Sequence, residues 1–121
     1  MTDTQAIDIL IVDDEQGVRD SFQLILEDQY KLAFACNGAD AFDMINDLTP
    51  RLILLDLKMP KVNGLELLKQ IKAAFPKQKV IIVTGYQSVD VAKETINLGA
   101  SDYVTKPFDS KTILSLVAKT I

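Results

Sequence analysis

Five short apolar runs alternate with segments of helical spacing, and this alternation limits the fold more than any other feature of the chain. The runs lie at residues 7–12, 30–36, 51–56, 79–84 and 101–105. The first, third and fourth are nearly continuous in isoleucine, leucine and valine, which is typical of strands buried on both faces of a parallel sheet. The alternation therefore predicts a parallel sheet covered by helices on both faces.

The segments between the runs place apolar side chains three or four residues apart, as one face of a helix requires. These positions are Val18, Phe22, Ile25 and Leu26; Ala41, Phe42, Ile45 and Leu48; Leu65, Leu68, Ile71 and Phe75; Val89, Ala92 and Ile96; and Leu114, Val117, Ala118 and Ile121. We therefore expect five helices, each with one apolar face turned to the core.

Polar residues at the ends of these segments support the same assignment. Asn63, Ser88 and Asp109 are expected to cap three of the helices at their N-termini. Asn63 has the spacing of a capping box with Glu66. Gly99 follows the fourth helical segment, where a helix C-terminus favours a left-handed residue. The helix boundaries are thus predicted independently of the apolar pattern.

The expected fold is α/β, a single (βα)5 domain over residues 1–121 with its core from about residue 6. A length of 121 residues suits one domain, and right-handed crossovers leave few topologies. We predict a flavodoxin-like three-layer sandwich with a five-stranded parallel sheet in the order 2-1-3-4-5. Ligands of such sheets bind beyond the carboxyl ends of the strands, at the switch point between strands 1 and 3.

Acidic residues follow both strands that border this switch point. Asp13, Asp14 and Glu15 come directly after the first apolar run, and Asp56 ends the third. Carboxylates repel one another, so such a cluster requires a cation, and Mg²⁺ suits oxygen ligands. We expect Asp13, Asp14 and Asp56 to bind this metal, and Glu15 to serve the N-terminus of the first helix.

Two further polar residues end the fourth and fifth strands. Thr84 supplies a hydroxyl, and Lys106, which precedes Pro107, supplies an ammonium. A transferred phosphoryl group spreads charge over three oxygens, which a metal, a lysine and a hydroxyl can each contact. A carboxylate can act as the nucleophile and form an acyl phosphate. Asp56 is the best candidate because it stands at the centre of the sheet.

Composition excludes several other kinds of site. The chain contains no histidine, which removes Ser/His/Asp triads and any phosphohistidine of its own. Its net charge of −4 disfavours direct nucleic-acid binding. Cys36 is the single cysteine, so no internal disulfide forms and a reducing cytoplasm is expected. No apolar run approaches the roughly 20 residues that span a membrane.

The sequence resembles the receiver domain of bacterial response regulators, chemotaxis-regulator-like proteins of two-component and phosphorelay systems. The resemblance extends from residue 7 to the final helix. The residues that carry it are Asp13-Asp14, Asp56, Met59-Pro60, Gly64, Thr84-Gly85, Tyr103 and Lys106-Pro107-Phe108.

The resemblance implies that Asp56 accepts a phosphoryl group from a sensor histidine kinase or a histidine phosphotransfer protein. Mg²⁺, or Mn²⁺ in its place, would be ligated by Asp14, Asp56 and the backbone carbonyl of Lys58. Asp13 would act mainly through a metal-bound water. The domain would assist its own phosphorylation and dephosphorylation without being a conventional turnover enzyme.

The resemblance also implies a switch. Thr84 and Lys106 would contact phosphoryl oxygens, and Tyr103 would turn inward when Thr84 moves, although an aromatic residue in this strand also suits the core. The Lys106–Pro107 bond would be cis. The face formed by the fourth helix, fifth strand and fifth helix would then control an output domain or downstream protein, and could pair two copies of the chain.

Three other residues have expected roles beside the acceptor. In the family that the sequence resembles, the positions two residues after Asp56 and Thr84 border the phosphoryl group, so the resemblance implies that Lys58 and Tyr86 tune dephosphorylation. We expect bulky Tyr86 to shield the acyl phosphate from water. Gly64 is expected to supply a permissive backbone.

Three alternatives stay open from sequence. An aspartyl-phosphate phosphatase of the haloacid-dehalogenase type would carry a D-x-D pattern and a cap, whereas Asp13 and Asp14 are adjacent and the chain is short. A flavodoxin-like electron carrier would meet repulsion between these acids and the FMN phosphate. A receiver-like interaction module that is never phosphorylated would usually lack one of the key residues, and all are present here.

Overall fold

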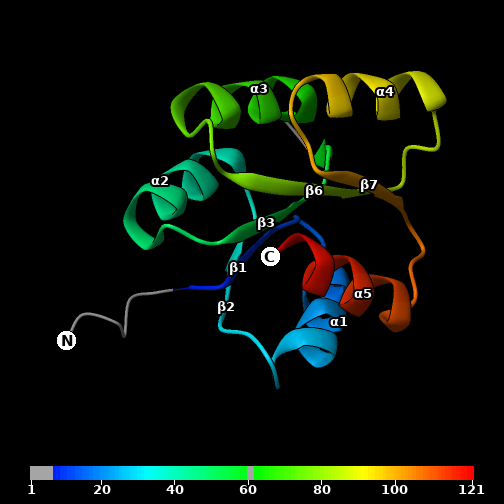
Figure 1. The fold of residues 1–121 in the computed structure, drawn as a ribbon. Helices are drawn as coiled ribbons and strands as arrows, with labels where there is room; N and C mark the ends of the chain where they lie inside the picture. The colour runs from blue at the N-terminus through cyan, green and yellow to red at the C-terminus, as the bar shows by residue number, and fades with distance from the viewer. Residues whose placement is uncertain (1–6, 60–61) are drawn as a thin grey trace.

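The computed structural model describes residues 7–59 and 62–121, so Pro60 of the Met59-Pro60 motif lies outside the described residues. Five parallel strands form the main sheet: β1 (Ile9–Val12), β2 (Leu32–Ala35), β3 (Leu52–Leu55), β6 (Lys79–Thr84) and β7 (Asp102–Thr105). Their order is β2-β1-β3-β6-β7 (Figure 1). Counted along the chain, this is the predicted order 2-1-3-4-5, and the fold is confirmed as flavodoxin-like.

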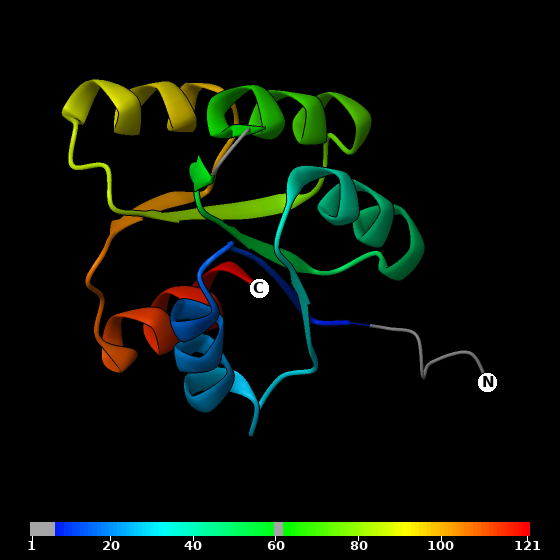
Figure 2. The same cartoon turned by 180° about the vertical axis from the view of Figure 1, so that it is seen from behind.

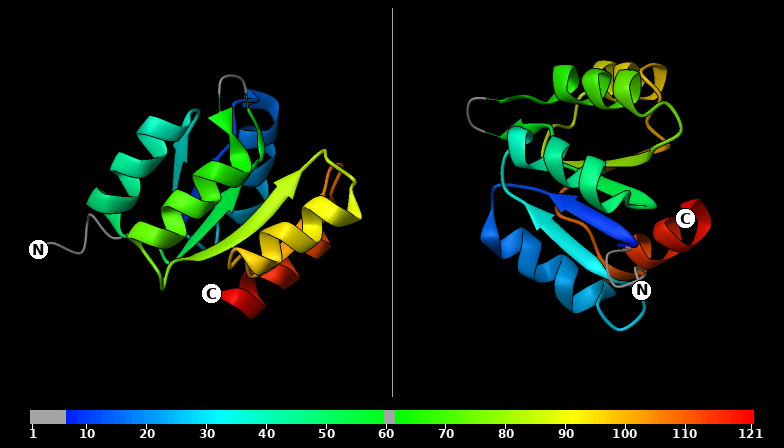
Figure 3. Two further views of the ribbon diagram at one scale, coloured as in Figure 1. Left: turned by 90° about the horizontal axis from the view of Figure 1, so that it is seen from above. Right: turned by 90° about the vertical axis from the view of Figure 1, so that its left-hand side faces the viewer.

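Helices cover both faces of this sheet. One layer contains α2 (Gly38–Leu48), α3 (Gly64–Ala74) and α4 (Val89–Asn97), and the other contains α1 (Gln16–Leu26) and α5 (Ser110–Thr120). The two layers lie on opposite sides of the strands, as Figure 2 and the right-hand view of Figure 3 show. No helix in the described part of the chain combines the length and the apolar composition that crossing a membrane requires.

The apolar strands divide their side chains between two cores. Successive residues of a strand point to opposite faces, so Leu10 and Ile53 pack under α2, α3 and α4, while Ile9 and Leu52 pack under α1 and α5. All eight residues of β1 and β3 are buried. Burial on both faces explains why these runs lack the polar alternation of a half-exposed strand.

The predicted caps are present. Side-chain oxygens of Asn63, Ser88 and Asp109 accept hydrogen bonds from backbone N–H groups at the starts of α3, α4 and α5. Gly99 follows α4 with φ of 107°, a conformation that strongly favours glycine. These local signals gave the helix boundaries to within a residue or two.

The predicted apolar face of α4 is wrong. Val89 and Ile96 of the expected stripe through Ala92 are 67% and 47% exposed. The buried face instead contains Thr95 and the partly buried Val91. The Thr95 hydroxyl donates a hydrogen bond of 2.8 Å to the Ala92 carbonyl, so this polar side chain is satisfied within the helix and can be buried.

A short hairpin after β3 was not predicted. It pairs β4 (Lys58–Met59) with β5 (Val62–Asn63) in antiparallel register, between β3 and α3. The permissive backbone expected at Gly64 is also corrected, because Gly64 has no positive φ. A Cβ atom there would overlap the backbone of Leu57, so glycine is required by close approach of two chain segments.

Candidate functional site

The carboxyl ends of β1 and β3 bring two acidic residues together. The strands pair in parallel with Val12 opposite Leu55, so Asp13 and Asp56 emerge side by side. The Asp56 N–H donates to the Val12 carbonyl at 3.0 Å, and the Asp13 N–H donates to the Ala35 carbonyl at 3.1 Å. Both side chains belong to residues that are only 2% exposed. The structure therefore places Asp13 and Asp56 together at the switch point, and it also shows that both are buried, which was not predicted.

Four acids form one cluster at this edge of the sheet. Asp13, Asp14, Glu15 and Asp56 each offer a carboxylate oxygen, and these oxygens lie within 4.8 Å of one another. Burial decreases from Asp13 and Asp56 through Asp14 to the exposed Glu15. A group made only of oxygen donors, with excess negative charge, fits a hard divalent cation such as Mg²⁺.

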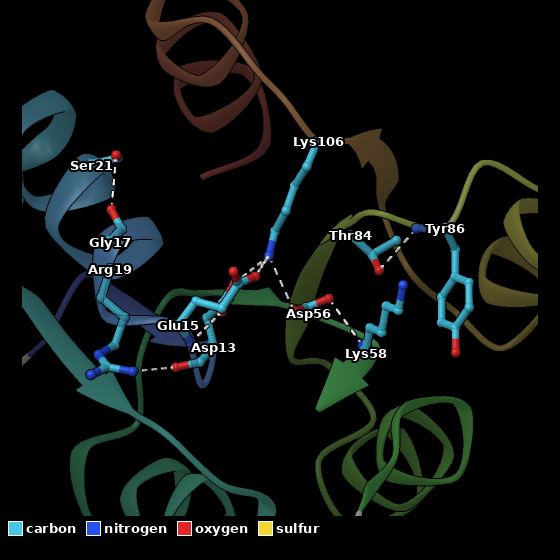
Figure 4. A network of polar contacts seen from close by, with 10 residues as sticks. All are labelled: Asp13, Glu15, Gly17, Arg19, Ser21, Asp56, Lys58, Thr84, Tyr86 and Lys106. Carbon is cyan, nitrogen blue, oxygen red and sulfur yellow. Dashed lines mark hydrogen bonds and ion pairs between the residues drawn. The ribbon is translucent and has the colours of Figure 1, made fainter. Parts of the chain in front are cut away.

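One ammonium group lies among these carboxylates (Figure 4). The Lys106 Nζ atom is 2.9 Å from Asp13 Oδ2, 3.1 Å from Asp56 Oδ2 and 3.2 Å from Glu15 Oε1. Burial by itself lowers the pKa of Lys106, but the hydrogen bond and charge of Asp13 and the charge of Asp56 raise it above the usual lysine value. Lys106 thus stays protonated and partly neutralises the pocket.

Asp13 is held by several hydrogen bonds, whereas Asp14 is not. Asp13 Oδ1 accepts from the Glu15 N–H at 2.9 Å, and its carbonyl accepts from Arg19 Nη1 at 2.8 Å. Burial raises the pKa of Asp13, and the hydrogen bonds from Lys106 and Glu15 oppose that rise. Among the described residues, no donor is hydrogen-bonded to the Asp14 carboxylate. The Asp14 carboxylate is therefore available to a cation without loss of a hydrogen bond to a described residue.

Both oxygens of Asp56 meet donors. Oδ1 accepts from the Lys58 N–H at 3.0 Å, and Oδ2 accepts from Lys106 at 3.1 Å. The Lys58 ammonium lies 5.4 Å from the centre of the Tyr86 ring, a cation–π distance. Lys58 and the partly exposed Tyr86 therefore form one side of the pocket beside Asp56 (Figure 4).

The backbone of Tyr86 is hydrogen-bonded to both Thr84 and Tyr103. Its N–H donates to Thr84 Oγ1 at 3.4 Å, and its carbonyl accepts from the Tyr103 hydroxyl at 2.7 Å. Thr84 is fully buried, and Tyr103 packs against the core under α3 and α4. Burial, and then the charge of Asp56, raise the pKa of Tyr103. Tyr103 is thus a core residue that also contacts the loop bordering the site.

The loop after β7 positions Lys106. The Lys106–Pro107 peptide bond is cis, and the Lys106 N–H donates to the Thr84 carbonyl at 2.8 Å. Phe108 stacks on Phe22 of α1, with ring centres 4.6 Å apart. The loop is therefore attached to both β6 and α1.

Two contacts of the site were not predicted. Glu15 lies at the N-terminus of α1, where its negative charge was expected, and its carboxylate also contacts Lys106 at 3.2 Å. The run of three acids was the only signal for this. Arg19 was not singled out, because a hydrogen bond from a helical arginine to the Asp13 carbonyl has no sequence pattern.

Comparison with known proteins identifies the family. The family model described as the response regulator receiver domain matches residues 9–118. Sporulation initiation phosphotransferase F of Bacillus subtilis (strain 168) is 38% identical over 112 residues, which cover 92% of this chain and 90% of that protein. Transcriptional regulatory protein ZraR of Klebsiella oxytoca is 39% identical over 106 residues, covering 87% of this chain but 24% of the relative.

Solved structures agree with this assignment. A CheY-like receiver domain protein from Methanospirillum hungatei JF-1 has a TM-score of 0.87 and 33% identity, covering 94% of this chain and 92% of that one. The receiver domain of NtrX from Brucella abortus has a TM-score of 0.88 and 34% identity, with coverages of 93% and 97%. The chain belongs to the response regulator receiver domain family, whose members are signalling switches of two-component systems and not conventional enzymes.

Proposed function

We propose that this chain is a phosphorylation-activated switch in which Asp56 accepts a phosphoryl group from the phosphohistidine of a sensor kinase or phosphotransfer protein. The observation that carries this proposal is the contact of one ammonium, Lys106 Nζ, with both Asp13 and Asp56 in a pocket of four acids. The chain has no histidine, so the donor imidazole belongs to a partner.

Asp56 suits the role of nucleophile. One of its oxygens would form a bond to phosphorus while the bond from phosphorus to the donor nitrogen breaks and the imidazole leaves with the electron pair. Lys106 already contacts Asp56 and would neutralise charge on a phosphoryl oxygen. The Thr84 hydroxyl, at the end of the neighbouring strand, would donate to another.

The acidic cluster would hold Mg²⁺, with Mn²⁺ as a substitute. We propose Asp14, Asp56 and the Lys58 carbonyl as direct ligands, because Asp14 is not engaged by any described donor. The Asp13 and Asp56 side chains each accept two hydrogen bonds, so the contacts do not separate their roles. We propose contact through a metal-bound water for Asp13 because the resemblance to receiver domains implies it. The bound cation would supply charge neutralisation for the phosphoryl oxygens.

Modification would reach the surface through Tyr86. A phosphoryl group changes the charge at Asp56 from −1 to about −2 and adds acceptor oxygens, which attract Thr84 and Lys106. Movement of Thr84 would act on the Tyr86 N–H and, through the Tyr86 carbonyl, on Tyr103. Coupling of this kind is typically about 1–3 kcal/mol.

The proposed output face is formed by α4, β7 and α5. Val89 and Ile96 on α4 are exposed apolar residues, and Tyr86, which precedes the helix, is 42% exposed. Large apolar side chains that stay exposed on one element support the proposal that another protein covers it. An output domain, a downstream protein or a second copy of the chain would bind there.

A separate groove is the proposed docking site of the phosphodonor protein. It has a volume of about 580 Å³ and lies between α1 and the loop after β7. Leu24, on its edge, is 78% exposed. Lys106 lines the groove and also contacts Asp56, so a donor seated there would stand next to the acceptor.

The test is incubation with Mg²⁺ and acetyl phosphate, followed by intact-mass measurement. We expect the mass of one phosphoryl group to be gained, and the gain to disappear in Asp56→Asn or without metal. Asp90→Asn, which removes an exposed acid of α4, is the matched control and should be modified normally. Modification that persists in Asp56→Asn would place the nucleophile elsewhere. No modification of the wild-type chain would favour an interaction module that is never phosphorylated.

A further inference from the structure

Arg19 contacts the acidic pocket through the main chain. It lies on α1, is partly buried, and its Nη1 atom donates to the Asp13 carbonyl at 2.8 Å (Figure 4). No carboxylate among residues 7–59 and 62–121 lies within ion-pair distance of it, although four acids cluster nearby. A charged donor next to an acidic pocket is thus bound to a neutral carbonyl.

This bond fixes the peptide unit that leads into Asp14. The Asp13 carbonyl and the Asp14 nitrogen and Cα lie in one plane, because the peptide bond is planar. The other side of Asp13 is also fixed, since its N–H donates to the Ala35 carbonyl at 3.1 Å. The Glu15 N–H is bound in turn to Asp13 Oδ1 at 2.9 Å. The loop that carries three of the four acids is therefore held at both ends of Asp13.

We propose that Arg19 is a positioning residue for the metal site: by orienting the peptide between Asp13 and Asp14, it holds the Asp14 carboxylate at the cation position and raises the affinity for Mg²⁺. This inference rests on the proposed function of the acidic cluster. It adds a residue that would not touch the cation.

The sign of the effect separates positioning from simple charge. A positive side chain near the pocket repels a divalent cation, so charge alone predicts that removing Arg19 strengthens Mg²⁺ binding. Positioning predicts the opposite, because Asp14 would sample orientations that do not face the cation. Loss of partners that orient metal ligands typically weakens metal binding by about 10–100-fold. We expect the lower end of that range, since the lost repulsion offsets part of the effect.

The experiment is calorimetric titration of the unphosphorylated full chain with Mg²⁺ at fixed ionic strength. Arg19→Met keeps a long, helix-compatible side chain and should weaken binding about tenfold. Lys69→Met removes one exposed positive charge from α3 and should leave the affinity unchanged. Equal or tighter binding by Arg19→Met would overturn the proposal.

A second variant covers the case in which Arg19→Met fails to fold. Arg19→Lys keeps the charge but lacks the Nη atoms that reach the carbonyl, so it should also bind Mg²⁺ more weakly than the wild-type chain, and equal affinity would overturn the inference. Circular dichroism and urea unfolding establish that each variant is folded before titration. If the wild-type chain itself fails to bind Mg²⁺, the proposed metal site falls and this inference with it. If the wild-type chain binds and a folded variant matches it, only the role of Arg19 fails.

Discussion

The Lys106 ammonium contacts Asp13, Glu15 and Asp56 at once, and its side chain is only 16% exposed. In the absence of a divalent cation, it is the charge that holds these mutually repelling carboxylates together. Removing one partner from a buried ion pair leaves the other charges uncompensated in a poorly solvated site.

Lys106→Met should therefore lower the free energy of unfolding by about 3 kcal/mol in metal-free buffer. Saturating Mg²⁺ should restore a larger share of stability in this variant than it adds to the wild-type chain, because the cation replaces the lost charge. Urea unfolding with and without Mg²⁺ measures both effects, with Lys69→Met as the exposed control. A variant as stable as wild type without metal would contradict this account of the pocket.

Tyr86 is the residue where the proposed shield can be tested. Its ring is held by the Lys58 ammonium at 5.4 Å, an interaction worth about 0.5–1 kcal/mol at an exposed site. Tyr86→Ala should shorten the lifetime of the phosphorylated form by roughly two- to fivefold if shielding depends on this contact. The rate at which the phosphoryl label is lost measures this lifetime. Tyr86→Phe keeps the ring and should decay like wild type, and unchanged decay in Tyr86→Ala would remove the idea.

At the scale of elements, Asp109 should make the stability of helix α5 depend on pH. Its side chain accepts from the Thr112 N–H at 2.7 Å, and this backbone hydrogen bond lowers the pKa of Asp109 below its ordinary value of 3.8. A lowered pKa in the folded state adds stability above the unfolded-state pKa, and this stability is lost as pH falls through the folded-state pKa.

Asp109→Asn keeps a capping oxygen but does not titrate. The wild-type chain should therefore be the more stable of the two at neutral pH by the charge-dependent part of the cap, and the difference should shrink below pH 3.8. Urea unfolding of both chains across this range measures the difference. A difference that stays constant with pH would show that the carboxylate charge does not stabilise α5.

The elements also show what sequence could predict. The strands of the main sheet followed from continuous apolar runs, and the helix ends followed from Asn63, Ser88 and Asp109, because these signals are local. The buried face of α4 could not be predicted, because Thr95 has a polar side chain. It can be buried since its hydroxyl donates a hydrogen bond to the Ala92 carbonyl of the same helix. The hairpin of β4 and β5 was missed because strands of two residues have no periodicity.

The site was predictable to the extent that topology alone builds it. Asp13, Asp56 and Lys106 directly follow strands, Thr84 is the last residue of β6, and parallel strands place such residues at one edge. The contacts of Glu15 with Lys106 depend on the path of a loop and on side-chain rotation, which a strand pattern does not describe. Positions at strand ends were therefore predictable, whereas the contact of Glu15 with Lys106 and the hydrogen bond from Arg19 on α1 were not.

At the scale of the whole molecule, a substitution in the groove beside α1 should distinguish a protein phosphodonor from a small-molecule one. A protein donor must cover surface near Asp56, whereas acetyl phosphate need not. Leu24→Ser should raise the KM for the cognate donor protein by about tenfold, because it removes an apolar side chain that the complex would bury. Phosphorylation by acetyl phosphate should not change.

Gln23→Ser is the matched control, since Gln23 is an exposed neighbour that does not line the groove. Initial rates of phosphotransfer at several donor concentrations, followed by intact mass, measure the difference. An unchanged KM in Leu24→Ser would place the donor on another surface.

The hydrogen bonds of Tyr86 would also carry an effect from the proposed output face back to the pocket at Asp56. The Tyr86 N–H donates a hydrogen bond to Thr84, on the pocket side, and the Tyr86 carbonyl accepts one from Tyr103, on the side of the proposed output face. Equilibrium linkage is symmetric. In the proposed switch, a binding partner that favours one position of Tyr103 would therefore change the equilibrium free energy of phosphorylating Asp56 by the same amount. The molecules that receive the signal would thus help to set the fraction of the chain that is modified.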